Sequence, residues 1–222
     1  MLNAILFDFD GVIVDSEPLH HRAFQAVLEP IGLGFSWDAY VDVYIGFDDR
    51  DAFGAAFEQA GRDLPPERLA ELIAKKAAAF RRLVAQDGAR PLPGAVELIR
   101  SLPSELPIAL CSGALREDIL PILRQLDLHD VFRTIVTADD VPKSKPDPAP
   151  YRLVLERLGL ADAPSRTVAI EDTPVGILSA KGAGTKVLAV ATGYDREFLL
   201  AADLIVDSLE NVDRSTLENV VP

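Results

Sequence analysis

Two aspartates, Asp8 and Asp10, lie two positions apart at the end of the first apolar segment, which reads AILFDF over residues 4–9. In extended backbone, side chains two residues apart point the same way, so both carboxylates can face one ligand. Two like charges at a buried position are unfavourable unless a cation neutralises them. The pair therefore predicts a cation site, although an acidic pair at a strand end is also typical of a helix cap or a solvated loop.

Three further polar segments extend this set. Ser112-Gly113 and Glu171-Asp172 each follow a short apolar segment, and Lys145 lies within the segment VPKSKPDP. Each segment alone is also typical of a turn or of a loop that ends in a helix cap. Taken together, the carboxylates, the hydroxyl and the lysine predict a magnesium site beside a phosphate pocket, because Mg²⁺ binds carboxylate oxygens and leaves room for phosphate.

The elements that must position these residues are short apolar segments separated by helical patterns. Continuous apolar segments are typical of strands buried on both faces of a parallel sheet. Asp147-Pro148 and Thr173-Pro174 each place a capping side chain before a proline suited to the first turn of a helix. The pattern predicts an α/β fold, a Rossmann-like parallel sheet flanked by helices, with ligands at the carboxyl ends of the strands. The expected strands are residues 4–9, 108–111, 134–137, 167–170, 186–190 and 204–206.

Residues 16–86 interrupt this alternation, because they contain helical stripes but no convincing strand. The clearest stripe runs from Leu69 to Val84. A structureless loop of this length is implausible within a compact domain. We therefore expect a Rossmann-like core formed by residues 1–15 and 87–222, with residues 16–86 inserted as a helical domain.

The composition excludes several classes of protein. The 222 residues carry a formal net charge of −13 without any basic cluster, so binding to nucleic acid or to an anionic membrane is not expected. The single cysteine, Cys111, cannot form an internal disulfide and is predicted to be a buried strand residue rather than a nucleophile. The N-terminal sequence does not resemble a signal peptide. Together with the single cysteine, it predicts a cytoplasmic protein. We expect a monomer, because no exposed apolar helix face is evident.

The four motifs, in this order, resemble those of the haloacid dehalogenase superfamily of phosphohydrolases. They read DFDGVIVDS, SG, KSKPDP and EDTPVGILSAKGAG, and the resemblance extends from about residue 4 to about residue 207. The chain is most similar to the branch with a helical cap inserted after the first motif. This branch includes β-phosphoglucomutases, phosphoglycolate phosphatases and sugar-phosphate phosphatases. The resemblance implies that the inserted domain is this cap.

The resemblance also implies a mechanism. Asp8 would be the nucleophile that forms an aspartyl-phosphate, and Asp10 would be the general acid and base. Mg²⁺ would be bound by Asp8, by the backbone carbonyl of Asp10 and by Asp172, with Glu171 binding directly or through water.

The phosphoryl oxygens of a small phosphorylated metabolite would be bound, by the same resemblance, by Ser112, the amide of Gly113 and Lys145. Lys143 is a nearby alternative to Lys145. The family pattern, in which the lysine directly precedes Pro-Asp-Pro, favours Lys145.

Two comparisons within the superfamily bear on the reaction. Dehalogenases lack the second aspartate, so Asp10 argues against carbon–halogen cleavage. β-Phosphoglucomutases carry a lysine and an asparagine where this chain has Leu115 and Arg116. We therefore expect a magnesium-dependent phosphatase that acts on a sugar phosphate or a phosphoglycolate-like metabolite. The alternatives are a β-phosphoglucomutase-type isomerase and a non-catalytic sensor of a phosphorylated metabolite.

Three residues are candidates for substrate recognition. His20 lies within LHH, which resembles a segment of sugar-phosphate members, and Arg50 ends GFDDR, which resembles the specificity loop of the cap. Arg116 could partly replace the missing mutase residues. A partly buried helix residue is the alternative for His20, and an exposed charge is the alternative for Arg50. Lys75 and Lys76 could also reach the cleft, but the favoured interpretation is that they form part of a solvated helical face.

Overall fold

The computed structural model describes all residues of the chain except Gly46 and divides into two compact units. The core unit comprises Met1–Asp15 and Arg90–Pro222, and the inserted unit comprises Ser16–Ala89. The inserted unit therefore ends at Ala89, whereas the sequence places its end at Gln86.

A six-stranded sheet forms the centre of the core unit, with the strand order β5-β4-β1-β6-β7-β8. All neighbouring strands are parallel. The chain starts in the middle of the sheet at β1, continues on one side through β4 and β5, and then fills the other side. The expected α/β fold is thereby confirmed. The strands are β1 (Ala4–Phe7), β4 (Ile108–Cys111), β5 (Thr134–Val136), β6 (Thr167–Glu171), β7 (Lys186–Val190) and β8 (Leu204–Val206).

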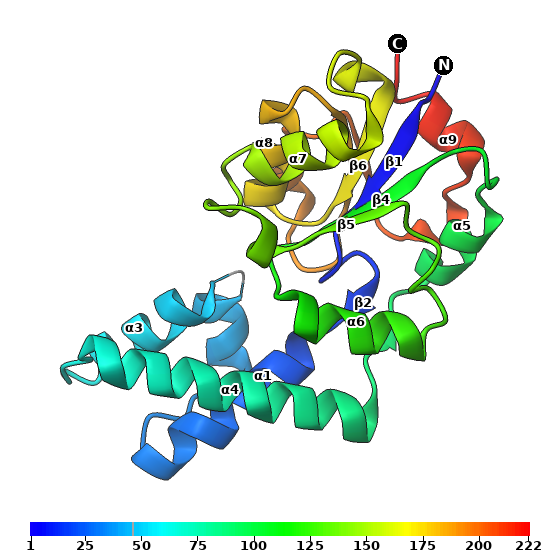
Figure 1. Cartoon of the computed structure of the whole chain (residues 1–222). Coiled ribbons are helices and arrows are strands. Elements are labelled where there is room, and N and C mark those ends of the chain that lie inside the picture. The colour runs from blue at the N-terminus through cyan, green and yellow to red at the C-terminus, as the bar shows by residue number, and fades with distance from the viewer. Residues whose placement is uncertain (46) are drawn as a thin grey trace. The chain divides into compact units, whose positions relative to one another are not determined.

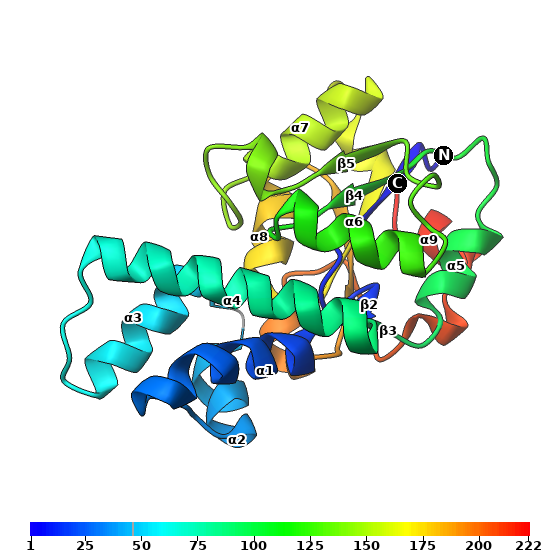
Figure 2. The same ribbon diagram turned by 60° about the horizontal axis from the view of Figure 1, so that its bottom comes forward.

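Helices cover both faces of this sheet. Figures 1 and 2 show α7 and α8 on one side and α5, α6 and α9 on the other. Burial on both faces explains why the strands read as continuous apolar segments. The helices of the core unit are α5 (Ala95–Ser101), α6 (Arg116–Gln125), α7 (Ala149–Leu158), α8 (Pro174–Gly182) and α9 (Arg214–Glu218). Its short 3₁₀ turns are η3 (Ala138–Asp140), η4 (Pro164–Arg166), η5 (Arg196–Leu199) and η6 (Leu209–Asn211).

Two strands are shorter than the sequence predicts. β1 ends at Phe7 rather than at Phe9, and β5 ends at Val136, one residue early. The first strand ends there because the chain begins a tight turn. The carbonyl of Phe9 accepts a hydrogen bond from the amide of Ile13 at 2.8 Å, and Gly11 has a φ of 74°. An apolar segment in the sequence can thus extend past the last residue that is hydrogen-bonded to a neighbouring strand.

The inserted unit is helical, and no strand occurs among its described residues. Aromatic side chains dominate its core, including Phe24, Tyr40, Tyr44 and Phe53, which pack with Leu72 of α4. The helical stripe that the sequence predicts is therefore the buried face of α4. The elements of this unit are α1 (Glu17–Leu28), η1 (Glu29–Ile31), α2 (Trp37–Ala39), η2 (Tyr40–Tyr44), α3 (Asp49–Gln59) and α4 (Pro66–Asp87).

A short antiparallel ribbon in the core unit joins the chain segments that precede and follow the insertion. It consists of β2 (Val14–Asp15) and β3 (Arg90–Pro91), with Val14 opposite Pro91. The sequence analysis missed this pair, because a strand of two residues has no periodic pattern.

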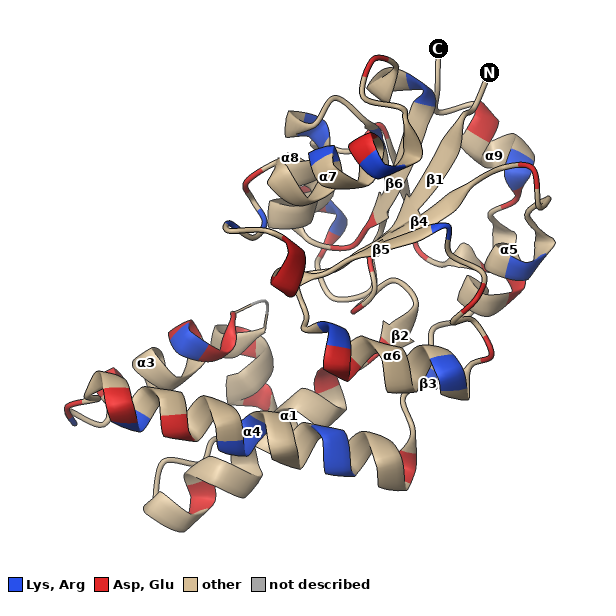
Figure 3. Ribbon diagram, viewed as in Figure 1, with Lys and Arg blue, Asp and Glu red and all other residues tan. Residues whose placement is uncertain are grey.

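Charged residues of both signs are distributed along the ribbon of both units (Figure 3). None of the helices in the described part of the chain combines the length and the apolar composition that a membrane-spanning helix needs. Apolar side chains are exposed on α8 and η5, where Val175, Leu178 and Phe198 are 42%, 56% and 58% exposed. The expectation of a monomer stays a prediction.

Candidate active site

The strand ends bring several predicted site residues to one edge of the sheet. β1 lies between β4 and β6, at the strand where the chain changes sides. Asp8 directly follows β1, Ser112 directly follows β4, and Glu171 and Asp172 lie at the end of β6. Open α/β sheets bind their ligands at this kind of position, outside the carboxyl ends of the strands.

A group of three carboxylates is formed there by Asp8, Glu171 and Asp172, which have ligand oxygens within 4.8 Å of one another. All three residues are buried. Two glycines provide the space for them. A Cβ atom on Gly11 would lie 1.9 Å from Oδ2 of Asp172, and one on Gly176 would lie 1.9 Å from Oε2 of Glu171. Any larger residue at either glycine would therefore displace a carboxylate.

Lys145 lies beside this group, and its side chain is only 8% exposed. Its Nζ is 2.8 Å from Oδ1 of Asp8 and 2.6 Å from Oε1 of Glu171. The segment that carries Lys145 is held by α8, because the hydroxyl of Ser179 donates to the carbonyl of Asp147 at 2.6 Å. The lysine is thus held in place by neighbouring structure.

The electrostatics of this group follow from its burial. Burial raises the pKa of Glu171, and the negative charge of Asp8 raises it further, against the opposing effect of Lys145. Burial alone would lower the pKa of Lys145, but Asp8 and Glu171 outweigh burial and raise it above its usual value. Lys145 is therefore charged at neutral pH and offsets part of the negative charge of the carboxylates.

The donor set fits a hard divalent cation. Oε2 of Glu171 is buried and accepts no hydrogen bond from any residue that the structure describes. A buried carboxylate oxygen without a donor is costly. Mg²⁺ binds such oxygens, commonly through one or two carboxylates of the protein. Asp8, Glu171 and Asp172 together offer this chemistry, since Lys145 offsets only one of three negative charges.

Ser112 and Gly113 lie at the end of the neighbouring strand. Ser112 is buried, and its hydroxyl oxygen accepts a hydrogen bond from the amide of Ala114 at 3.0 Å. Gly113 is exposed and shortly precedes α6. A backbone amide before the first turn of a helix suits an anion, because the helix dipole is positive at that end.

Asp10 is half-buried in the turn that follows Asp8. Its backbone forms a bridge with Val14, and the hydroxyl of Thr192 donates to the carbonyl of Gly11 at 2.6 Å. The side chain of Asp10 is not one of the three grouped carboxylates. Its assignments as proton carrier and as a metal ligand through its carbonyl stay predictions.

Arg116 forms contacts that the sequence did not indicate, and its expected role in substrate recognition stays a prediction. Its guanidinium is 2.8 Å from Asp140 and donates to the carbonyl of Ile135 at 2.9 Å. Asp140 also pairs with Arg157 at 2.7 Å. Although burial opposes it, hydrogen bonds from Arg157, Thr137 and Arg116 hold the pKa of Asp140 well below its usual range. This network ties Arg116 to the loop after β5.

Lys143, the alternative to Lys145, has a side chain that is 74% exposed. Its nearest acidic partner is Asp147, at 3.8 Å. The structure thus distinguishes the two lysines by burial and places only Lys145 against Asp8 and Glu171.

His20 lies in the inserted unit, in a cluster that the sequence did not predict. Lys76 of α4 is buried, and its Nζ is 2.6 Å from Oδ1 of Asp49 and 2.8 Å from Nδ1 of His20. The ring of His20 stacks on Phe80, with centroids 4.3 Å apart. Burial and the positive charge of Lys76 hold the pKa of His20 well below its usual value. The interpretation of Lys76 as part of a solvated face is therefore wrong, whereas Lys75 is exposed as expected.

The remaining residues of the predicted specificity loop are exposed or outside the described residues. Arg50 is exposed in the first turn of α3, and Asp48 caps this helix by accepting from the amide of Asp51 at 2.9 Å. Gly46 lies outside the described residues.

Two buried residues of the core unit complete the surroundings of Lys145. Cys111 is buried as predicted, and burial raises the pKa of its thiol, which is therefore not a nucleophile at neutral pH. Tyr151 of α7 is fully buried, and its hydroxyl donates to Oε1 of Glu171 at 2.5 Å. The sequence analysis missed Tyr151, because an aromatic residue on a helical face is usually part of the core.

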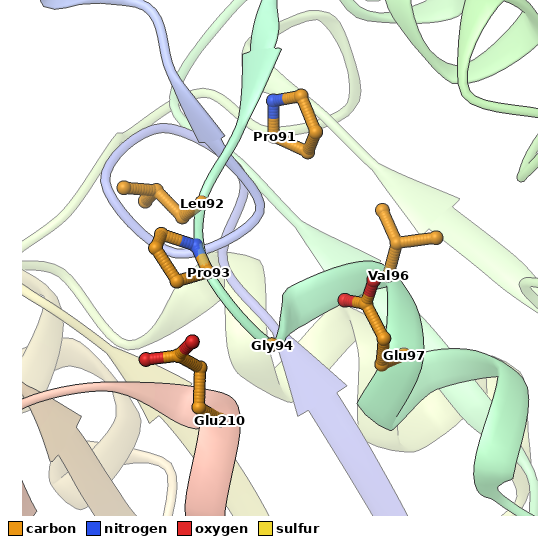
Figure 4. Close-up of a pocket in the computed structure, with 7 residues that line it drawn as sticks. All are labelled: Pro91, Leu92, Pro93, Gly94, Val96, Glu97 and Glu210. Carbon is orange, nitrogen blue, oxygen red and sulfur yellow. The ribbon is translucent and has the colours of Figure 1, made fainter.

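A cavity of about 470 Å³ lies elsewhere in the core unit. It is lined by residues of the β3–α5 segment and of η6. Two of these residues, Glu97 and Glu210, carry a carboxylate (Figure 4). No member of the carboxylate group or Lys145 lines it. The candidate active site is therefore the group formed by Asp8, Glu171, Asp172 and Lys145. It is chosen for the chemistry of its side chains and not for the size of a cavity.

Comparison with known proteins agrees with this geometry. The family model described as haloacid dehalogenase-like hydrolase matches residues 5–190. The chain belongs to the haloacid dehalogenase-like hydrolases. The resemblance inferred from the four motifs is thus confirmed, and the carboxylate group lies within the matched region.

Individual members of this family are similar over nearly the whole chain. The phosphorylated carbohydrates phosphatase of Thermotoga maritima is 32% identical over 82% of either chain. A mutant of CbbY from Rhodobacter sphaeroides, crystallised with xylulose-(1,5)bisphosphate, is 26% identical with a TM-score of 0.87, covering 98% of this chain and all of that chain. The β-phosphoglucomutase of Clostridium difficile shares the fold, with a TM-score of 0.84 at 22% identity, covering 99% and 96% of the two chains.

Proposed function

We propose that this chain is a magnesium-dependent phosphoric monoester hydrolase that acts on a small phosphorylated metabolite, a sugar phosphate or a phosphoglycolate-like compound. The observation that carries this proposal is the buried strand-end group, in which Asp8 lies 2.8 Å from Lys145 beside Glu171 and Asp172. The similarity to a phosphorylated carbohydrates phosphatase and to CbbY bound to a sugar bisphosphate supports this class of substrate.

The reaction has two displacement steps, as expected for a carboxylate nucleophile. In the first, an oxygen of Asp8 attacks phosphorus, the bond from phosphorus to the substrate oxygen breaks, and Asp10 gives a proton to that oxygen. In the second, Asp10 takes a proton from water as the water attacks phosphorus. Inorganic phosphate leaves, and the carboxylate of Asp8 is regenerated.

The other residues of the site stabilise charge on the transferring group. Lys145, Ser112 and the amide of Gly113 would bind phosphoryl oxygens, which carry most of the negative charge in the transition state. Because Lys145 is buried and held by its neighbours, its charge needs no rearrangement before the reaction.

A divalent cation adds the charge that the protein lacks there. When bound, Mg²⁺ supplies Lewis-acid stabilisation of phosphoryl oxygens. Asp8, Asp172 and the carbonyl of Asp10 would hold it, and Glu171 would do so directly or through water. The buried Oε2 of Glu171 supports this assignment.

Substrate recognition by His20 and Arg50 stays a prediction. His20 is hydrogen-bonded to Lys76, and Arg50 is exposed in the first turn of α3. The same holds for Arg116, which forms an ion pair with Asp140.

A β-phosphoglucomutase-type isomerase is the less supported alternative. The common fold favours it. Against it, the exposed apolar side chain of Leu115 lies at the position where the mutases of this family carry a lysine, and a leucine cannot bind a second phosphate. An isomerase would release little inorganic phosphate and would depend on a bisphosphate primer.

The test is release of inorganic phosphate from a panel of sugar phosphates, phosphoglycolate, glycerol phosphate and nucleotide monophosphates. Each is measured with Mg²⁺, with a chelator, and with Asp8→Asn as the control. Release that requires both Mg²⁺ and Asp8 supports the proposal. Release that persists in Asp8→Asn would contradict the mechanism, and a silent panel with primed isomerisation would favour the alternative.

A further inference from the structure

Tyr151 is a buried polar residue next to the site to which the reaction assigns no step. It lies on α7, within the apolar cluster formed by α7, α8 and the strands, and is 0% exposed. Its hydroxyl donates to Oε1 of Glu171 at 2.5 Å. A buried tyrosine hydroxyl requires a hydrogen-bond partner, and here the partner is a carboxylate of the acidic group.

The two oxygens of Glu171 have different surroundings. Oε1 accepts hydrogen bonds from Tyr151 and from Lys145, at 2.5 Å and 2.6 Å. Oε2 accepts none from the part of the chain that the structure describes, and it lies in the space left by Gly176. All hydrogen bonds that the described residues donate to Glu171 are thus directed to Oε1, and Oε2 is buried without a donor.

This asymmetry needs a second donor besides Lys145. The terminal torsion of a glutamate is broad and twofold, so a single donor does not determine which oxygen it binds. Lys145 is also shared with Asp8, 2.8 Å away, so it is not directed to Glu171 alone. Tyr151, by contrast, donates from a rigid ring within the core. The same ring lies 5.3 Å from Nζ of Lys145, within the range of a cation–π contact, so it also restrains the lysine.

We propose that Tyr151 is a positioning residue that orients the carboxylate of Glu171 so that Oε2 faces the bound cation. The inference rests on the proposed function, because it assumes that this group binds Mg²⁺. Partners behind a metal ligand commonly change metal affinity by one to two orders of magnitude, although they never touch the metal.

The experiment measures the Kd of Mg²⁺ by titration calorimetry on the full chain, without substrate. Tyr151→Phe removes the hydroxyl but keeps the ring in the core. Tyr44→Phe is the matched control, because Tyr44 is also buried and its hydroxyl donates to Gln59 at 3.1 Å in the inserted unit. Near-UV circular dichroism of each variant in chelator verifies that it is folded.

We expect Tyr151→Phe to raise the Kd of Mg²⁺ roughly tenfold and Tyr44→Phe to leave it unchanged. In phosphate release, Tyr151→Phe should raise the concentration of Mg²⁺ needed for half-maximal activity. Saturating Mg²⁺ should then return kcat to within about threefold of wild type, because the hydroxyl does not contact the reacting atoms.

A double-mutant cycle distinguishes an effect of Tyr151 through Glu171 from a general structural effect of the substitution. If Tyr151 acts through Glu171, adding Tyr151→Phe to Glu171→Gln changes the Kd of Mg²⁺ by less than about twofold. The inference is overturned if Tyr151→Phe alone binds Mg²⁺ within twofold of wild type, or if its effect is equally large in the Glu171→Gln background. Absence of Mg²⁺ binding by the wild-type chain would instead overturn the cation site itself, and the inference with it.

Discussion

Each unit of this protein buries a lysine side chain against at least one carboxylate, and the two lysines have different surroundings. Lys145 in the core unit is 8% exposed and contacts Asp8 and Glu171. Lys76 in the inserted unit is 6% exposed and contacts Asp49 and His20. Burial of a charged amine is costly in both cases, so each must be offset by its neighbours.

The difference lies in the balance of charge. In the core unit, one lysine faces three grouped carboxylates, so two negative charges remain when all are ionised. In the inserted unit, Lys76 faces one carboxylate and a histidine whose lowered pKa keeps it neutral, with its Nζ 4.7 Å from the ring centre of Phe24. The second cluster is therefore balanced, whereas the first requires an additional cation. A buried lysine alone does not indicate a metal site; an excess of buried carboxylates does.

The largest expected difference concerns catalysis. Asp8→Asn should lower phosphate release by at least about a thousandfold, because it removes the nucleophile and a metal ligand. Asp49→Asn, which removes the carboxylate that pairs with the other buried lysine, should leave the Kd of Mg²⁺ within about twofold of wild type. Phosphate assays and titration calorimetry on both variants test this contrast. Equal losses of Mg²⁺ affinity in the two variants would contradict it.

The second prediction concerns the stability of variants in which Lys76 or Lys145 is replaced by methionine, with and without Mg²⁺. Lys76→Met should lower the free energy of unfolding by about 2 kcal/mol, because Asp49 loses its partner but remains partly exposed. Lys145→Met should lower it by about 3 kcal/mol in chelator, since the buried carboxylates of Asp8 and Glu171 lose the lysine that pairs with both.

Relative to wild type in the same buffer, Mg²⁺ should recover most of the stability deficit of Lys145→Met, because removal of the lysine leaves more uncompensated negative charge for the cation to neutralise. It should recover none of the deficit of Lys76→Met, because this variant keeps the core cluster and is stabilised by Mg²⁺ as much as wild type. Urea unfolding with and without Mg²⁺ measures both values. Recovery of both variants, or of neither, would show that the two clusters do not differ in their need for a cation.

A third prediction compares two helix glycines. In Gly176→Ala, the new Cβ would lie 1.9 Å from Oε2 of Glu171, so the carboxylate must move and the Kd of Mg²⁺ should rise about tenfold. In Gly54→Ala on α3, the Cβ meets no described atom within 4 Å, so the variant should be neutral or more stable by about 0.5–1 kcal/mol. Calorimetry and urea unfolding test the pair. Unchanged Mg²⁺ affinity in Gly176→Ala would mean that Glu171 does not depend on this space.

The smallest expected effect is a pH dependence of stability from the balanced cluster. Because the pKa of His20 is lower in the folded protein than in the unfolded chain, the unfolded state binds more protons as the pH falls below about 6.5. The contribution of His20 to stability is therefore present above this pH and lost below it, by at most about 1.4 kcal/mol per pH unit.

The measurement is the difference between wild type and His20→Phe in urea unfolding from pH 7.5 to 5.5. Wild type should lose more stability than the variant as the pH decreases. Parallel curves would show that His20 titrates similarly in both states.

Much of the fold follows from local features of the sequence. The continuous apolar segments predicted the six strands of the main sheet, and Asp147-Pro148 and Thr173-Pro174 marked real helix starts. The side chain of Asp147 accepts from the amide of Ala149 at 2.9 Å, and that of Thr173 accepts from Gly176 at 3.1 Å. Such features involve residues close in sequence, which is why they could be predicted.

The sequence predicted most residues of the candidate site, but it did not predict which of them contact one another. Motif order identified Asp8, Lys145, Glu171 and Asp172, because parallel strands bring their carboxyl ends to one edge. It did not indicate that Lys145 would contact both Asp8 and Glu171, nor that Tyr151 would donate to Glu171.

One wrong interpretation and one unexpected contact have the same cause, which is pairing between residues far apart in sequence. Lys76 was interpreted as solvated, yet it pairs with His20, 56 positions away. The sequence likewise did not indicate that Arg116 would pair with Asp140, 24 positions away. A charged side chain on a helix looks the same in sequence whether it faces water or a buried partner.

The amino-acid sequence by itself determined which chemical groups this protein carries and in what order along the chain. It thereby also determined the α/β core and the helical insertion, because helices and strands depend mainly on local patterns of apolar residues. Only the tertiary structure decided which charges are buried together and which are balanced. Coulombic interaction and desolvation depend on distance in space and on exclusion of water, and neither is encoded by position along the chain.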